Sequence, residues 1–208
     1  MTQTSIALFE MPQVTQISQT FVCFGTPRGG TSMVAGALHG LGIPMGEDLP
    51  VNIEDPLFNP DGKGKLGPFI EQMKETIRSR NQTLQTWGWK YPRAATYLSS
   101  LHPILRNPRY IVVLRDPVPG GLRSTKGGNS GLDYVRAVLR LALENIRTIE
   151  TYKAPTLLVS YEKASQNPKV FLKELSEFSG MPLPQDLSPL LEFMTPGSYK
   201  APIQTKPE

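Results

Sequence analysis

The chain has 208 residues, of which 20 are Pro, 18 are Gly and 39% are hydrophobic. Pro and Gly together make up roughly 18% of the chain, against an average of about 12%, which excludes a helical bundle or a coiled coil; the share stays below the roughly 25–30% of low-complexity chains. The only cysteine, Cys23, excludes an intrachain disulfide and a thiolate metal cluster. We therefore expect one globular domain over 1–208, in a reducing compartment.

The charge is distributed unevenly along the chain. There are 22 Lys and Arg against 18 Asp and Glu, a net charge of +4. Residues 78–147 hold 12 Lys and Arg against three acids, whereas residues 44–62 hold five acids and no base. A basic half of this kind predicts an anionic ligand.

Nothing in the sequence resembles a signal peptide or a membrane span. No Lys or Arg precedes Arg28 to form the n-region of a signal peptide, and no run reaches the ~18 apolar residues of a membrane span. We expect a cytoplasmic protein without a membrane span.

Short apolar runs rich in aromatic and β-branched residues predict buried strands. They occupy residues 21–24, 110–114 and 156–159, and residues 87–89 are a candidate for a further strand. We expect residues 1–19 to form an N-terminal extension.

Because proline is excluded from helix interiors, the gaps between prolines predict where helices lie. The longest gap contains apolar residues at helical spacing, which predicts an amphipathic helix over roughly 132–151. Helices alternating with buried strands indicate an α/β domain of three layers, with a central parallel sheet and helices on both faces. We expect an irregular tail over 182–208. The gaps that allow helices are 28–43, 69–91, 120–154 and 169–181.

A glycine-rich turn follows the first buried strand and leads into a predicted helix. It reads Gly25-Thr26-Pro27-Arg28-Gly29-Gly30-Thr31-Ser32. Glycines let backbone N–H groups converge on an anion, and a helix N-terminus adds unpaired donors and partial positive charge. The frame matches the P-loop of nucleotide-binding proteins, except that Thr31 replaces its lysine, which disfavours an ordinary ATPase or GTPase. Arg28 supplies a cation aimed differently, which suits an anion other than a triphosphate.

A second candidate anion-binding segment follows the strand that ends at Leu114. It contains Arg115, Arg123 and Ser124. Because ligands of open parallel sheets bind at the carboxyl ends of the strands, Arg115 is expected at the same edge as the glycine-rich turn. Two such segments indicate a ligand with two separated anionic groups.

At this point the sequence resembles the sulfotransferases that use 3′-phosphoadenosine 5′-phosphosulfate (PAPS). The glycine-rich turn is similar to their 5′-phosphosulfate loop, and Leu114-Arg115-Asp116-Pro117 through Ser124 is similar to their 3′-phosphate segment. Trp89-Lys90-Tyr91-Pro92 resembles the Lys-x-Pro of the protein-tyrosine branch, and Ser160-Tyr161-Glu162 resembles a Tyr-Glu late in the fold. These matches span about residues 20–170 in the family's order.

The resemblance implies roles for the matching residues. Arg28, Gly29, Gly30, Thr31 and Ser32 would hold the 5′-phosphosulfate, with Arg28 neutralising its charge, and Lys90 would stabilise the leaving group. Arg115 would hold the 3′-phosphate together with Arg123 or Ser124. The family's serine stands one position earlier relative to the arginine, where this chain has Arg123, so both residues stay candidates. No metal is required.

The acceptor's proton needs a base, which the small-molecule branch supplies as a histidine just beyond the lysine. Here Tyr91 and Pro92 occupy that stretch. The protein-tyrosine branch instead places a glutamate about 20 residues beyond the loop arginine; Glu47 and Asp48 lie 19 and 20 residues after Arg28. Glu54 and Asp55 lie in the same acidic strip and are rival candidates, which burial near Lys90 would distinguish.

The function that we expect is sulfuryl transfer from PAPS to an acceptor hydroxyl or amine on a P-loop-like α/β domain. The acceptor stays open among carbohydrate, metabolite, lipid and peptide, and so does the oligomeric state. Alternatives are an ATP-dependent P-loop kinase, which the missing lysine disfavours, and a non-catalytic nucleotide-binding or interaction protein on the same scaffold. We interpret the basic helix residues Arg136, Arg140 and Arg147 as a charged exterior and expect no nucleic-acid partner.

Overall fold

The computed structural model of the chain describes residues 3–9, 18–125 and 130–195. Strands β2, β3, β4 and β5 run parallel to one another, and β1 pairs with β5 in the antiparallel sense. The order across the sheet is β1-β5-β4-β2-β3. The strands are β1 Ser5–Leu8, β2 Gln19–Gly25, β3 Thr86–Lys90, β4 Pro108–Leu114 and β5 Thr156–Ser160.

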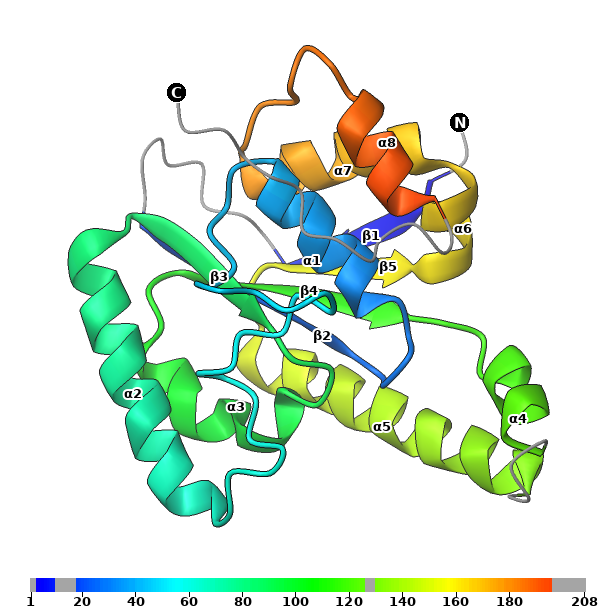
Figure 1. The fold of residues 1–208 in the computed structure, drawn as a ribbon, viewed down its shortest axis with the longest axis horizontal. Helices are drawn as coiled ribbons and strands as arrows, with labels where there is room; N and C mark the ends of the chain where they lie inside the picture. Colours follow the sequence, from blue (N-terminus) through cyan, green and yellow to red (C-terminus); the bar gives the residue numbers. More distant parts are fainter. Residues whose placement is uncertain (1–2, 10–17, 126–129, 196–208) are drawn as a thin grey trace.

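Helices cover both faces of this sheet (Figure 1). Helices α1, α6, α7 and α8 lie on one face, and α2, α3 and α5 on the other. The predicted three-layer α/β architecture is therefore confirmed. The helices are α1 Thr31–Gly40, α2 Leu66–Thr83, α3 Ala95–Leu101, α4 Val118–Thr125, α5 Gly131–Tyr152, α6 Tyr161–Gln166, α7 Pro168–Ser179 and α8 Ser188–Met194, with a 3₁₀ turn η1 at His102–Ile104.

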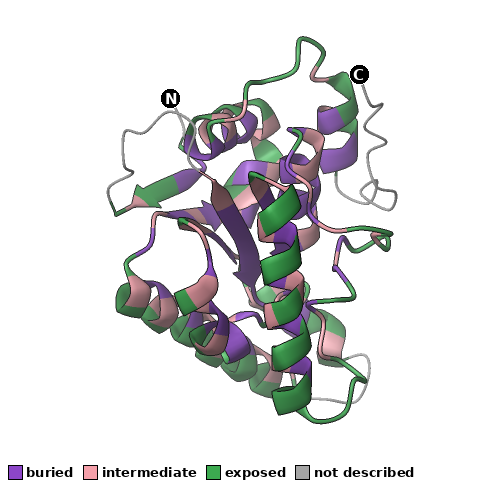
Figure 2. Cartoon of the chain, turned by 90° about the vertical axis from the view of Figure 1, so that its left-hand side faces the viewer, coloured by how far each residue is buried: buried purple, intermediate pink, exposed green. Residues whose placement is uncertain are grey.

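The alternation of side chains along the central strand divides the core into two halves. Phe21 and Cys23 of β2 pack with the helices of the first face, and Val22 and Phe24 pack with those of the second. All four are fully buried. Figure 2 shows the central strands as the buried middle layer, with exposed residues on the outer sides of the helices, whereas the edge strand β1 is partly exposed.

Two expectations about the ends of the chain are wrong. Strand β1 lies within residues 1–19, which we expected to be an extension, and it makes the sheet mixed rather than wholly parallel. Helix α8 lies within 182–208, which we expected to be irregular; residues 196–208 lie outside the described part. β1 escaped notice because it is short and has only two large apolar residues, Ile6 and Leu8.

Helices α2, α4, α7 and α8 depart from the proline gaps because each has a proline in its first turn, whereas α3 and α6 lie outside the gaps without one. Proline is tolerated in the first turn of a helix, where its missing N–H has no intrahelical partner to lose. Pro68 and Pro119 lie in the first turns of α2 and α4, which therefore begin before the predicted gaps. Pro189 lies in the first turn of α8. Within the described ranges, no helix is long and apolar enough to cross a bilayer.

Candidate active site

The glycine-rich turn connects β2 to α1 as predicted, and its glycines are required by close contacts. A Cβ atom on Gly25 would lie 2.4 Å from the carbonyl oxygen of Val113, and one on Gly29 would lie 2.6 Å from that of Thr26. Gly30 has a φ of +91°, and a Cβ atom there would lie 2.0 Å from the Tyr161 ring. The turn is therefore packed closely against β4 and α6.

The side chains of the turn have different surroundings. Arg28 is exposed and has a positive φ of 60°. Thr31 is buried, only 3% exposed, and packs against Gly25. The Ser32 hydroxyl donates a hydrogen bond of 2.9 Å to the carbonyl oxygen of Asn52. Of these three residues, Arg28 is the one whose side chain faces solvent.

Asn145 of α5 holds the start of the glycine-rich turn through a hydrogen bond. Its amide nitrogen donates a hydrogen bond of 2.7 Å to the carbonyl oxygen of Gly25, and the residue is only 2% exposed. Asn145 is not among the site residues that the sequence motifs predicted. The signal was present as a polar residue on the apolar face of the predicted 132–151 helix, because a buried amide needs a hydrogen-bond partner.

Lys90 ends β3, which is paired with β2, and it is 1% exposed. Its ammonium group donates to Glu54 Oε1 at 2.7 Å and to the carbonyl oxygen of Asn52 at 2.9 Å. Since Ser32 also donates to Asn52, this carbonyl connects Lys90 to the start of α1. Burial lowers the pKa of Lys90, and the hydrogen bond and charge of Glu54 oppose that shift. Burial raises the pKa of neighbouring Cys23 to about 12.

The acidic strip reaches Lys90 through Glu54. The Glu54 side chain is 14% exposed, and its second carboxylate oxygen accepts a hydrogen bond of 3.0 Å from Asn59. Asp55 is buried and forms an ion pair of 2.6 Å with Arg80, so its carboxylate is occupied within the protein interior. Glu47 and Asp48 are exposed, and neither forms an ion pair with Lys90. The structure thus brings Glu54 to the lysine, and not the two acids that the spacing from Arg28 favoured.

The second anion-binding segment lies against the glycine-rich turn. Arg115 donates a hydrogen bond of 2.9 Å to the carbonyl oxygen of Arg28, and its guanidinium carbon lies 4.2 Å from the centre of the Tyr161 ring. Glu162 Oε1 lies 3.9 Å from Arg115 Nε and accepts a hydrogen bond of 3.1 Å from the backbone N–H of Asp116. The Tyr-Glu pair therefore orients Arg115 from the start of α6.

A small pocket opens between the two segments. Arg28, Arg115 and Arg123 line it, with Asp116 as the acidic residue in its wall. Ser124 is half-buried outside this lining. Three guanidinium groups against one carboxylate make the pocket suited to an anion.

The sequence matches no protein-family model. No curated protein matches it either.

Solved structures, by contrast, share its fold. The sulfotransferase domain of the Synechococcus PCC 7002 olefin synthase aligns with a TM-score of 0.56 and 17% identity, covering 92% of this chain and 82% of that one. A sulfotransferase domain from the curacin biosynthetic pathway aligns with a TM-score of 0.54 and 14% identity, covering 89% and 80%. Retinol dehydratase in complex with retinol and PAP aligns with a TM-score of 0.50 and 15% identity, covering 88% of this chain and 66% of that one. The chain therefore has the α/β fold of the sulfotransferases.

Proposed function

We propose that the chain transfers a sulfuryl group from PAPS to an acceptor hydroxyl or amine. The observation that carries this proposal is the position of Lys90, buried at the end of β3 beside the glycine-rich turn and held by a carboxylate. Arg115 and Arg123 support it, because they place two further cations beside the glycine-rich turn, where they would hold the 3′-phosphate that distinguishes PAPS from ATP. The structural neighbours support the same chemistry, since two are sulfotransferase domains and the third is a complex with PAP.

The donor residues fit such a ligand. The glycines of the turn allow a ligand to approach its backbone closely, and Arg28 adds an exposed cation. Arg115 and Arg123 line the same pocket as Arg28. Bound PAPS supplies an activated sulfuryl group with a phosphate leaving group. The phosphosulfate would be contacted by the backbone N–H groups and hydroxyls of Gly29, Gly30, Thr31 and Ser32. To make this contact, the Ser32 hydroxyl would give up its hydrogen bond to the carbonyl oxygen of Asn52.

Glu54 and Lys90 divide the reaction between them in this proposal. Glu54 accepts the proton of the acceptor hydroxyl or amine as that atom bonds to sulfur. The bond between sulfur and the bridging oxygen breaks, and Lys90 stabilises the negative charge that develops on that oxygen. Once Glu54 has accepted the proton, its attraction for Lys90 falls, which frees the ammonium group to face the leaving oxygen. Adenosine 3′,5′-bisphosphate and the sulfated acceptor are the products.

A binding titration tests the donor assignment without knowledge of the acceptor. Adenosine 3′,5′-bisphosphate, ATP and Mg²⁺-ATP are titrated into the wild type, Arg115→Ala and Arg136→Ala. Arg136 is an exposed arginine of α5, so its variant has the same change in charge away from the pocket. We expect the bisphosphate to bind best and Arg115→Ala to weaken it by about 10–100-fold, as loss of charged hydrogen bonds predicts. Equal or tighter binding of ATP would contradict the proposal.

A further inference from the structure

The two edges of the sheet are treated differently by the rest of the chain. At the β3 edge, the backbone N–H of Gly88 donates a hydrogen bond of 2.8 Å to the carbonyl oxygen of Pro44, so a loop covers the strand. Met45 of the same loop lies 3.2 Å from the position of a Cβ atom on Gly88. At the other edge, β1 pairs only with β5 among the described residues. One edge is therefore closed by the chain itself, whereas no described residue pairs with the outer side of the other.

The register of β1 shows which backbone groups point outward. The N–H of Ser160 donates to the carbonyl oxygen of Thr4, and Ile6 lies opposite Leu158. Because hydrogen-bonded and non-bonded pairs alternate in an antiparallel ladder, the N–H and C=O groups of Ile6 face β5. Those of Ser5 and Ala7 face away from the sheet. These outward groups form a template for another strand.

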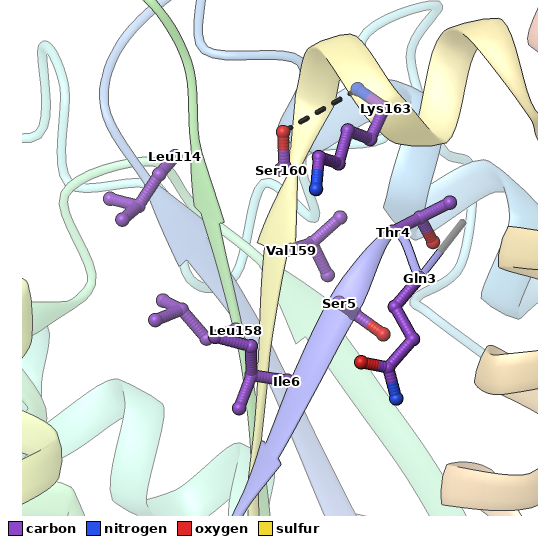
Figure 3. A pocket seen from close by; sticks show the side chains of 9 residues that line it. All are labelled: Gln3, Thr4, Ser5, Ile6, Leu114, Leu158, Val159, Ser160 and Lys163. Atoms are coloured by element: carbon purple, nitrogen blue, oxygen red, sulfur yellow. Dashed lines mark hydrogen bonds between the residues drawn. The ribbon is translucent and has the colours of Figure 1, made fainter. Parts of the chain in front are cut away.

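The surfaces on either side of β1 are hollowed. One hollow is bordered by Ile6, Leu114 and Leu158, and Figure 3 shows Ile6 beside Leu158 there. The other is bordered by Ser5, Ala7 and the α7 residues Glu174, Glu177 and Phe178. An added strand would place alternate side chains over these two hollows.

The side chains of the edge favour pairing with an identical strand. Ile6 is 59% exposed, and β1, although only four residues long, contains none of the prolines, charges or bulges that protect natural edges. The acidic groups nearby are already engaged: Glu174 accepts a hydrogen bond of 2.6 Å from the Ser5 hydroxyl, and Glu177 lies 3.8 Å from Lys173. The edge strand therefore presents an apolar residue between small ones and carries no charged side chain of its own.

We propose that two copies of this chain associate through β1, in antiparallel pairing about a two-fold axis at Ile6. In this register both outward groups of Ser5 bond to those of the partner's Ala7, and Ala7 bonds likewise to the partner's Ser5. Ile6 then lies opposite the partner's Ile6, which covers the exposed side chain. The two sheets become one continuous sheet, with an isologous contact that closes at two copies. The association does not depend on the proposed function.

Light scattering and cysteine cross-linking test this dimer and its register. Multi-angle light scattering of the wild type is expected to give twice the mass of the chain. Ile6→Lys places like charges opposite each other and is expected to give the single-chain mass at the same concentration. Leu122→Lys is the matched control, because Leu122 is 65% exposed on α4, away from β1. A monomeric wild type, or a dimer that persists in Ile6→Lys, would overturn the proposal.

Cross-linking separates the register from general association and avoids a charged variant. The native Cys23 is fully buried, so an introduced cysteine is the reactive one. Under mild oxidation, Ile6→Cys is expected to form an intermolecular disulfide at least tenfold faster than Leu122→Cys, because residues opposite each other have Cβ atoms about 4.5–5.5 Å apart. Equal rates for the two variants would overturn the two-fold register at Ile6.

Discussion

Lys90 and Arg115 both lie at the carboxyl ends of the parallel strands, but their surroundings differ. Lys90 is enclosed by protein partners, whereas Arg115 is partly exposed to solvent. Lys90 is 1% exposed and held by Glu54 and Asn52. Arg115 keeps 25% of its side chain exposed, and the exposed Arg28 and Arg123 share its pocket. The residues proposed to bind the nucleotide are accessible to solvent, whereas the two residues proposed to take part in the reaction, Lys90 and Glu54, form a largely buried ion pair with each other.

This difference predicts that the two regions respond differently to substitution. Changes in the pocket should act on affinity, because its arginines meet a ligand that arrives from solvent. Changes at Lys90 and Glu54 should act on the rate of transfer, because their mutual contact must be exchanged during the reaction.

The largest effect is expected from Glu54→Gln, which keeps the size of the side chain and one of its two acceptor oxygens but removes the base. Sulfuryl transfer should fall by about 10²–10⁴-fold, with the affinity for adenosine 3′,5′-bisphosphate little changed. Single-turnover transfer from labelled PAPS, using an acceptor found by screening, measures the rate. Glu47→Gln and Asp48→Asn are the matched controls, since both acids are exposed. A larger loss in either control than in Glu54→Gln would return the base to the acids that sequence spacing favoured.

Lys90→Gln is expected to slow transfer by about 10²–10³-fold, the cost of losing one preorganised group at a developing oxyanion. Glutamine keeps a donor for the carbonyl oxygen of Asn52, which limits damage to the corner. The same single-turnover assay is used, with bisphosphate affinity as the second readout. If affinity falls as much as rate, Lys90 binds the nucleotide rather than stabilising the leaving group.

A smaller effect distinguishes Arg123 from Ser124 in the arginine pocket. Arg123 lines the pocket and Ser124 does not, so Arg123→Ala should weaken bisphosphate binding about tenfold, whereas Ser124→Ala should change it less. Isothermal titration at fixed ionic strength gives both constants. The reverse order would assign the 3′-phosphate to Ser124, as the family's pattern favours.

Local patterns predicted the layers of the fold and the position of the glycine-rich turn. The apolar runs and the turn each depend on residues that are close in sequence, so their signals survive without tertiary information. The pairing of Lys90 with Glu54 spans 36 residues and depends on how the 42–65 loop folds back. Spacing from Arg28 cannot encode that path, which is why Glu54 was only one of four candidate acids in the sequence and Asn52 emerged only from the structure.

The contact made by Asn145 is the most distant of these, since it joins residues 120 apart in sequence. Asn145→Leu would leave the carbonyl oxygen of Gly25 buried without this donor and should lower the free energy of unfolding by about 1–3 kcal/mol. Urea denaturation measures the loss. Thr148→Ala is the control on the same helix, because its hydroxyl bonds only to the carbonyl oxygen of Glu144 in the preceding turn.

The same variant also tests whether Asn145 positions the glycine-rich turn. Its side chain contacts the turn at Gly25 and does not line the arginine pocket. Bisphosphate affinity measured well below the urea midpoint should therefore fall by less than about tenfold, since the turn loses one anchor but no ligand contact. Unchanged affinity together with lowered stability would make Asn145 a purely structural residue, and the close contacts of the glycines would suffice to hold the turn in place.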